Sequence, residues 1–175
     1  MACLKVAHLG HPVLREHAVP LTDDAIRSDE TRRLIDNMIE TLHEYEGVGL
    51  AGPQVHELKR VVLVEVPPAA GDPVPLIVLL NPEIVEASDE MEEDWEGCLS
   101  IPDLRGVVPR AARVRVRGKD GSANEKTISA GGFAARILQH EIDHLDGIVF
   151  LDRMTDMKTL TFLPEYGRYW TTDDD

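Results

Sequence analysis

The segment His140–His144 reads His-Glu-Ile-Asp-His, which is the pattern H-E-x-x-H. Residues four apart on an α-helix lie on one face, so the two imidazoles can bind one metal ion from adjacent turns. Glu141 follows the first histidine and can take a proton from water at that metal. Leu138, Ile142 and Leu145 form the opposite face, which has to be buried. The pattern therefore predicts an internal helix that carries two ligands and a general base.

Two histidines do not complete a catalytic metal site, which usually has three protein ligands and an open position. One protease pattern places a third histidine where this chain has Phe150. Glu165 lies at the distance of another protease pattern, but Pro164 precedes it and the segment lacks a clear helical face. Cys98 remains, because a thiolate binds zinc or ferrous iron strongly. From chemistry alone, Cys98 is either this ligand or a small buried hydrophobic residue.

A glycine-rich segment, Gly47–Gln54, precedes this cysteine. Its glycines allow the backbone to approach a ligand closely, and Gln54 offers an amide donor. No Lys-Ser or Lys-Thr pair follows, which argues against a phosphate-binding loop. From its residues alone, the segment is either part of a binding site or the turn that ends a helix.

Helical spacing of apolar residues predicts helices over 29–45 and 133–146, each followed by a glycine. Runs of β-branched and aliphatic residues predict strands over 60–66, 76–81, 112–117, 125–129 and around 149–150. A turn at 119–122 joins the third strand to the fourth as a hairpin. Pro164 limits any helix in the last segment. These elements predict an α+β fold, in which mostly antiparallel strands surround a central HExxH helix.

Length and composition favour one globular domain, and we expect residues 1–175 to form a single catalytic domain. The net charge of −14 opposes tight binding to nucleic-acid phosphates. The longest apolar stretch, Leu76–Leu80, is far too short to cross a membrane. The N-terminus lacks the features of a leader, which favours a bacterial cytoplasm. The only two cysteines, Cys3 and Cys98, argue against a disulfide scaffold.

Three segments together resemble the motifs of the peptide deformylases: Gly47–Gln54, Glu96–Ser100 and Gln139–His144. That family has a Gly-x-Gly-Leu-x-Ala-x-Gln-like loop, then Glu-Gly-Cys-Leu-Ser, then Gln-His-Glu-x-Asp-His. The resemblance covers nearly the whole chain, from His11–Leu14 to Leu151–Asp152. It implies a hydrolase that removes the formyl group from the N-terminal methionine of nascent proteins, so N-formylmethionyl peptides are the expected partners.

Carried over position by position, the resemblance implies the residues of the reaction centre. One divalent metal ion, Fe²⁺ in nature and replaceable by Zn²⁺, Ni²⁺ or Co²⁺, would be bound by Cys98, His140 and His144. Glu141 would be the general base and then the proton donor.

The resemblance also implies the residues that hold the substrate. The side chain of Gln54 and the backbone N–H of Leu99 would hydrogen-bond the oxyanion that forms on the formyl carbonyl. Gly49 would pair its backbone with the substrate peptide. The methionine side chain would enter an apolar pocket lined by Val48, Phe133 and Ile137.

Metal-bound imidazoles usually donate their second N–H to a carboxylate or a carbonyl. We therefore expect Glu96 to support the metal ligands and Asp143 to pair with Arg110 or Arg105. A plain surface salt bridge is an equally good interpretation of Asp143.

Three features depart from the family pattern. Gly52 stands where the family usually has Ala and would add backbone freedom. Arg136 stands where some members are apolar; we expect it at the rim of the cleft, where it would alter substrate preference. In bacterial members with a basic C-terminal helix, that helix docks on the ribosome. The acidic end Asp173–Asp175 argues against this mode of docking here.

Three competing functions differ in what they require. An endopeptidase is permitted by His140–His144 alone, but Phe150 and the weak case for Glu165 disfavour it. A hydrolase of other N-formyl or N-acyl compounds would use the same catalytic residues. A non-catalytic, metal-stabilised binding module would not need Glu141, although every expected catalytic residue is present.

Overall fold

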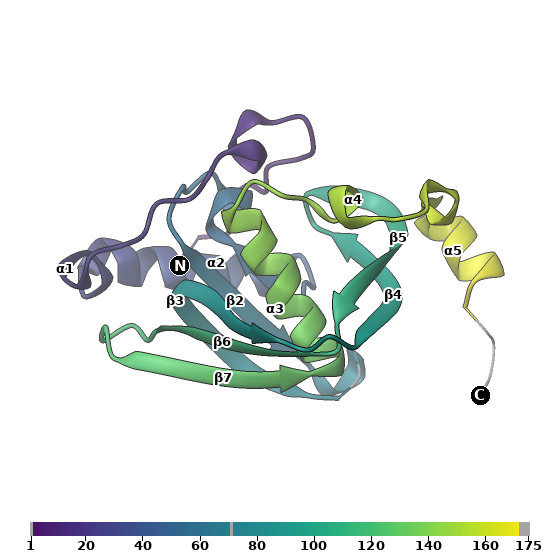
Figure 1. The fold of residues 1–175 in the computed structure, drawn as a ribbon. Coiled ribbons are helices and arrows are strands. Elements are labelled where there is room, and N and C mark those ends of the chain that lie inside the picture. The colour runs from purple at the N-terminus through teal and green to yellow at the C-terminus, as the bar shows by residue number, and fades with distance from the viewer. Residues whose placement is uncertain (1, 71, 172–175) are drawn as a thin grey trace.

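Helix α3 (Gly132–Leu145) lies against a five-stranded sheet and beside a three-stranded sheet in the computed structural model, which describes residues 2–70 and 72–171 (Figure 1). All strand pairs within the two described sheets are antiparallel. The predicted α+β fold with a central HExxH helix is therefore confirmed.

The larger sheet has the strand order β1-β2-β3-β6-β7. Its strands are β1 (Gly49–Ala51), β2 (Val61–Val66), β3 (Val74–Ala87), β6 (Arg113–Lys119) and β7 (Glu125–Gly131). The four strands predicted within 60–129 all form, and the strand predicted over 76–81 extends further at both ends. The turn predicted at 119–122 begins the β6–β7 hairpin, in which Lys119 pairs with Glu125.

Strand β2 is buried on both faces, and its alternation divides the core in two. Val62, Val64 and Val66 pack in the cluster that contains the apolar side of α3, namely Leu138, Ile142 and Leu145. Val61 and Leu63 pack in a second cluster on the other face, together with helix α2 (Asp29–Glu44) through Leu34, Met38 and Leu42. Packing of its apolar face therefore holds helix α3 in place, as its sequence predicts.

Helix α2 begins at a Ser28 side chain that accepts the backbone N–H of Thr31. It ends one residue before the predicted boundary, and Glu46 rather than Gly47 adopts the left-handed conformation, with φ of 51°. Glycine is needed at position 47 for another reason, which is that a side chain does not fit there. A Cβ at this position would lie 2.9 Å from Cδ1 of Leu99.

The smaller sheet has the order β4-β5-β8, with β4 (Met91–Cys98), β5 (Ile101–Ala111) and β8 (Thr161–Phe162). The sequence patterns do not predict these strands. Leu99 and Ser100 form the tight turn between β4 and β5, so that Cys98 pairs with Ile101. This turn presents the cysteine at the end of a strand, beside α3.

Helix α3 ends before Gly147, whose φ of 71° suits glycine. The prediction of a strand around Val149–Phe150 is wrong, because the chain forms helix α4 (Phe150–Arg153) there. The carboxylate of Asp152 accepts the backbone N–H of Val149, which caps this helix, and Phe150 is buried. The short apolar run is therefore a buried helix start.

A seven-residue helix, α5 (Leu163–Tyr169), forms in the last segment, where Pro164 occupies the first turn and needs no hydrogen-bond partner for its nitrogen. The remaining short elements are α1 (Asp23–Ile26) and the 3₁₀ turns Pro12–Arg15, Gly52–Val55, Pro68–Ala70 and Met157–Thr159. The acidic end Asp173–Asp175 lies outside the described residues. Among the described helices, none is both long enough and apolar enough to cross a membrane.

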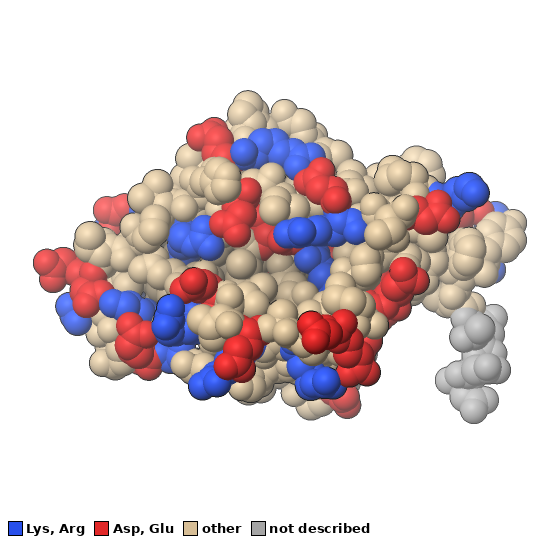
Figure 2. Space-filling model, viewed as in Figure 1, with Lys and Arg blue, Asp and Glu red and all other residues tan. Residues whose placement is uncertain are grey.

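The outer face of β6 carries the arginines that alternate with its buried valines. Each arginine pairs with a glutamate: Arg113 with Glu90, Arg115 with Glu86 and Arg117 with Glu83. Figure 2 shows basic and acidic side chains interspersed over the viewed face. Mixed charge of this kind gives solubility rather than a basic surface for nucleic acid.

Candidate active site

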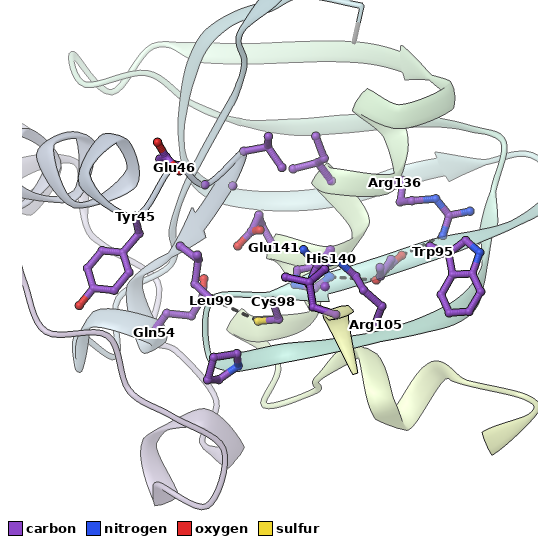
Figure 3. Close-up of a pocket in the computed structure, with 18 of the residues that line it drawn as sticks. Tyr45, Glu46, Gln54, Trp95, Cys98, Leu99, Arg105, Arg136, His140 and Glu141 are labelled. Atoms are coloured by element: carbon purple, nitrogen blue, oxygen red, sulfur yellow. Dashed lines mark hydrogen bonds and ion pairs between the residues drawn. The ribbon is translucent and has the colours of Figure 1, made fainter. Parts of the chain in front are cut away.

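The three candidate metal ligands come from two elements that meet beside a cavity, and Figure 3 shows two of them, Cys98 and His140. Cys98 is the last residue of β4, and His140 and His144 lie on successive turns of α3. Their ligand atoms lie within 4.8 Å of one another, and Sγ of Cys98 is 3.3 Å from Nε2 of His144. One thiolate and two imidazoles suit zinc or ferrous iron. The donor set therefore fits one divalent metal ion.

The thiol of Cys98 lies in surroundings that favour its ionised form. Burial by itself raises its pKa, but the charges of His144 and His140 and their hydrogen bonds bring the pKa well below its ordinary value. The thiolate is the form that binds a metal.

The carboxylate of Glu96, which is buried, orients one of the histidines. Its Oε2 lies 2.9 Å from Nδ1 of His140, which leaves Nε2 of that ring available as a ligand atom. Burial alone would raise the pKa of Glu96, but hydrogen bonds from His140 and Arg110 and their charges lower it to about 2. The expected supporting contact of Glu96 is present. Nδ1 of His144 is buried without a hydrogen-bond partner among the described residues.

Glu141 is also buried and lines the same cavity. Burial raises its pKa to about 7, although the charges of His140 and His144 oppose this rise. Its Oε2 has no hydrogen-bond partner within the described part of the chain. Gly49 leaves the space that this carboxylate occupies, because a Cβ at that position would lie 2.3 Å from Oε1 of Glu141. The arrangement leaves a proton acceptor beside the metal ligands.

Gln54 has its amide held with the nitrogen toward the cysteine. Its Oε1 accepts the backbone N–H of Ala51 at 2.8 Å, and Nε2 lies 3.5 Å from Sγ of Cys98 and 3.3 Å from Oγ of Ser100. The glycine-rich segment supplies this side chain, so it is more than a helix stop. Leu99 follows the cysteine in the tight turn and also lines the cavity.

Gly52 allows a close approach within this segment. A Cβ there would lie 2.5 Å from the carbonyl oxygen of Lys59 and 2.8 Å from that of Glu57. Its φ is not positive, so the expected gain of backbone freedom is replaced by a demand for space.

The cavity beside these groups has a volume of about 590 Å³. All four predicted substrate-binding residues line it: Val48, Gly49, Phe133 and Ile137. Ile137 is buried, whereas Phe133 is 42% exposed. The wall combines apolar side chains with several charged and polar ones, so it can take an apolar side chain and the polar backbone of a peptide.

Asp143 is buried and forms ion pairs with two arginines. Nη1 of Arg110 lies 2.6 Å from Oδ2, and Nη2 of Arg153 lies 2.6 Å from Oδ1. The expected pairing with Arg110 is present, and the alternative of a surface salt bridge is wrong. Arg105 is not a partner: it donates to the carbonyl of Leu104. Arg153, the last residue of helix α4, was not predicted as a partner.

Arg136 differs from its predicted position. It borders the cavity, but it is only 5% exposed and is hydrogen-bonded to Glu96 rather than free at the rim. Its place on α3, one turn before His140, is a sequence signal for a buried position, whereas its partner Glu96 depends on which strand packs there.

The other candidates for a third ligand lie apart from the metal cluster. Phe150 packs with its ring stacked on that of His140, at 6.4 Å between centroids. Glu165 pairs with Arg168 within α5. Among the described residues, the cluster of possible ligands is completed by Cys98 instead.

A helix with two histidines and a neighbouring glutamate, joined by a thiolate and by an amide donor beside an apolar cavity, defines a metal-dependent amide hydrolase. A family model described as polypeptide deformylase matches residues 3–160. The chain belongs to the peptide deformylase family. It is a hydrolase that removes the N-formyl group from the N-terminal formylmethionine of nascent proteins, releasing formate.

Individual relatives are similar over most of their length. A peptide deformylase of Halothermothrix orenii is 47% identical over 156 residues, which cover 88% of this chain and 95% of that protein. One from Salinibacter ruber is 43% identical over 157 residues, covering 85% of this chain and 79% of that protein.

Solved structures of peptide deformylases are also similar to this chain. The Met-Ala-Ser-bound crystal structure of a class I type b peptide deformylase from Acinetobacter baumannii has a TM-score of 0.84 at 40% identity, covering 87% of this chain and 99% of that one. A peptide deformylase from Thermotoga maritima has a TM-score of 0.81 at 35% identity, covering 89% and 100%.

Proposed function

We propose that this chain removes the formyl group with one divalent metal ion held by Cys98, His140 and His144. Fe²⁺ is the native ion, and Zn²⁺, Ni²⁺ or Co²⁺ can replace it, because a mixed thiolate and imidazole site accepts all four. The compact donor cluster supports this ligand set. When bound, the ion supplies Lewis-acid chemistry: it activates water and polarises the formyl carbonyl.

Glu141 is the general base of the proposed reaction. Its buried carboxylate, with one oxygen unpartnered among the described residues, is the single observation that carries the proposal. The carboxylate accepts a proton as the water oxygen attacks the formyl carbon. It then gives that proton to the amine as the C–N bond breaks, and formate leaves.

Gln54 and Leu99 stabilise the negative charge that develops on the formyl oxygen. Nε2 of Gln54 already points toward Cys98, and the backbone N–H of Leu99 lies in the adjacent turn. Loss of one such donor costs about 3 kcal/mol of transition-state stabilisation in other hydrolases.

The cavity accepts the methionine side chain, and Gly49 pairs its backbone with the substrate peptide. Val48, Phe133 and Ile137 provide the apolar wall for the thioether chain. The relative from Acinetobacter baumannii crystallised with Met-Ala-Ser supports a methionyl peptide as the occupant.

We further propose that residues 1–175 form a single catalytic domain that acts on N-formylmethionyl nascent peptides in a bacterial cytoplasm. The family match over most of the chain and the bacterial sources of the relatives support this. The net charge of −14 argues against direct binding to nucleic acid and against ribosome docking through an acidic C-terminus.

Formate release from formyl-Met-Ala-Ser, measured with protein purified anaerobically, tests the proposal beside a Glu141→Ala variant. We expect release by the wild type and a loss of at least about 10²-fold in the variant. Acetyl-Met-Ala-Ser and unformylated Met-Ala-Ser serve as substrate controls. Cleavage of the unformylated peptide would favour the endopeptidase, and equal rates for the formyl and acetyl peptides would favour a general acyl hydrolase.

A further inference from the structure

The guanidinium group of Arg136 joins helix α3 to both long strands of the smaller sheet. Nη1 donates to Oε1 of Glu96 at 2.9 Å and to the carbonyl of Val108 at 2.7 Å. Nη2 donates to the carbonyl of Glu92 at 2.7 Å. One side chain therefore holds main-chain positions on β4 and β5 and a carboxylate between them.

These contacts lie between the two halves of the metal centre. Strand β4 ends at Cys98, and α3 carries His140 one turn after Arg136 (Figure 3). Glu96, also on β4, contacts Nδ1 of His140. A shift of β4 relative to α3 would therefore move the thiolate away from the imidazoles and turn the oriented ring at the same time.

Arg110 binds the same carboxylate but differs in what it fixes. It comes from β5 and meets Glu96 with two hydrogen bonds, through Nε at 2.9 Å and Nη2 at 3.1 Å. Its third contact is the carboxylate of Asp143. Arg110 thus aligns side chains, whereas Arg136 also binds backbone carbonyls and fixes the separation of the strand from the helix.

We propose that Arg136 is a positioning residue for the metal centre, which sets the spacing between the strand of Cys98 and the helix of His140 and His144. This inference rests on the metal ligands of the proposed function. It replaces the expectation that Arg136 tunes substrate preference from the rim of the cleft. A planar group with five donors suits this role, because one lysine ammonium cannot reach the same set of acceptors.

The test measures metal release as well as activity. Wild type, Arg136→Met and Arg136→Lys are loaded with Co²⁺, and loss of the ion to a chelator is followed by the visible absorption of the bound metal. Arg117→Met is the matched control, because Arg117 is 56% exposed and pairs with Glu83 on the outer face of the larger sheet. We expect metal loss at least about 10-fold faster in both Arg136 variants, since substitutions of groups that support metal ligands cost this much.

We also expect a changed Co²⁺ spectrum in the Arg136 variants and wild-type behaviour in Arg117→Met. Arg136→Lys keeps the charge near Glu96. If Arg136→Met does not fold, the spectrum and the rate of metal loss of Arg136→Lys test the inference. An unchanged spectrum and an unchanged rate of metal loss would overturn the inference, whatever happened to the melting temperature. Failure of the proposed function is distinguishable, because a wild type that binds Co²⁺ but releases no formate contradicts the reaction and leaves the metal measurement intact.

Discussion

At the scale of single residues, Gly49 packs tightly on the carboxylate of Glu141 in the active site. Substituting Gly49 with Ala places a methyl group 2.3 Å from Oε1 and 2.7 Å from Cδ of this carboxylate. The carboxylate is the movable partner and has to leave its place. We expect kcat to fall by about 10²-fold, because a displacement of about 1 Å in a reacting group has that effect.

Metal content should be unchanged in Gly49→Ala, because the three atoms nearest to an added Cβ at Gly49 all belong to Glu141. Steady-state kinetics with formyl-Met-Ala-Ser and metal analysis of the same sample check both parts. Gly121→Ala is the control, since a Cβ at Gly121 meets no atom within 4 Å. Wild-type kcat in Gly49→Ala would show that Glu141 need not hold its observed place.

The residues of the site differ in whether a local sequence pattern predicts their contacts. His140, Glu141 and His144 are brought together by helix geometry alone, so their spacing in the sequence predicts their contact. The contacts of Arg136 and Arg153 depend on which strand or helix packs beside α3. That information is tertiary, so the sequence pattern placed Arg136 wrongly and left Arg153 unnoticed.

At the scale of elements, β4 and β5 show why part of the fold was not predicted. Met91–Cys98 contains four acidic residues, and Ile101–Ala111 contains two prolines and a glycine, so neither has the composition of a strand. Their pairing is fixed by contacts with α3, α4 and β8 instead. By contrast, β2 and β6 are rich in valine and were predicted close to their observed bounds.

The start of α4 is tied to the N-terminal part of the chain by Asp152 and Arg15. Burial raises the pKa of Asp152, but the hydrogen bonds of Arg15 and of the Val149 N–H, with the Arg15 charge, lower it below its ordinary value. A carboxyl whose pKa is lowered by folding stabilises the protein above its unfolded pKa of about 3.9 and loses this contribution as pH falls through the folded pKa.

Asp152→Asn should therefore be less stable than the wild type at neutral pH by at most about 1 kcal/mol, because both partners are partly exposed. Asn can still accept the Val149 N–H, so the substitution isolates the charge. We expect the difference in free energy of unfolding to be constant between pH 7 and about 5 and to shrink below about pH 4. Urea unfolding of both proteins, kept metal-free with a chelator, measures it across this range, because acid would otherwise remove the ion by protonating its ligands. A difference that persisted unchanged at pH 3 would contradict the assignment.

At the scale of the whole molecule, the proposed metal centre would connect the two sheets. Cys98 ends β4 of the smaller sheet, whereas His140 and His144 lie on α3, whose apolar face packs on the larger sheet. The sequence predicted an α+β fold around this helix, because its two-faced pattern needs a core on one side and ligands on the other. Which strands pair, and in which order, follows from long-range packing that no local pattern contains.

Because the proposed ligands come from the smaller sheet and from the helix that packs on the larger sheet, metal binding should stabilise the molecule as a whole. At a free metal concentration 100 times Kd, binding to the folded state alone adds about 2.7 kcal/mol, which raises the Tm of a chain of this size by roughly 5–11 °C. Scanning calorimetry of chelator-treated protein with and without added Zn²⁺ measures this shift. Cys3→Ser, at an exposed thiol, should keep the full shift, whereas Cys98→Ser should lose most of it. An equal shift in Tm in both variants would mean that the stabilising ion binds away from Cys98. Side-chain packing and ion pairs alone would then connect the two sheets.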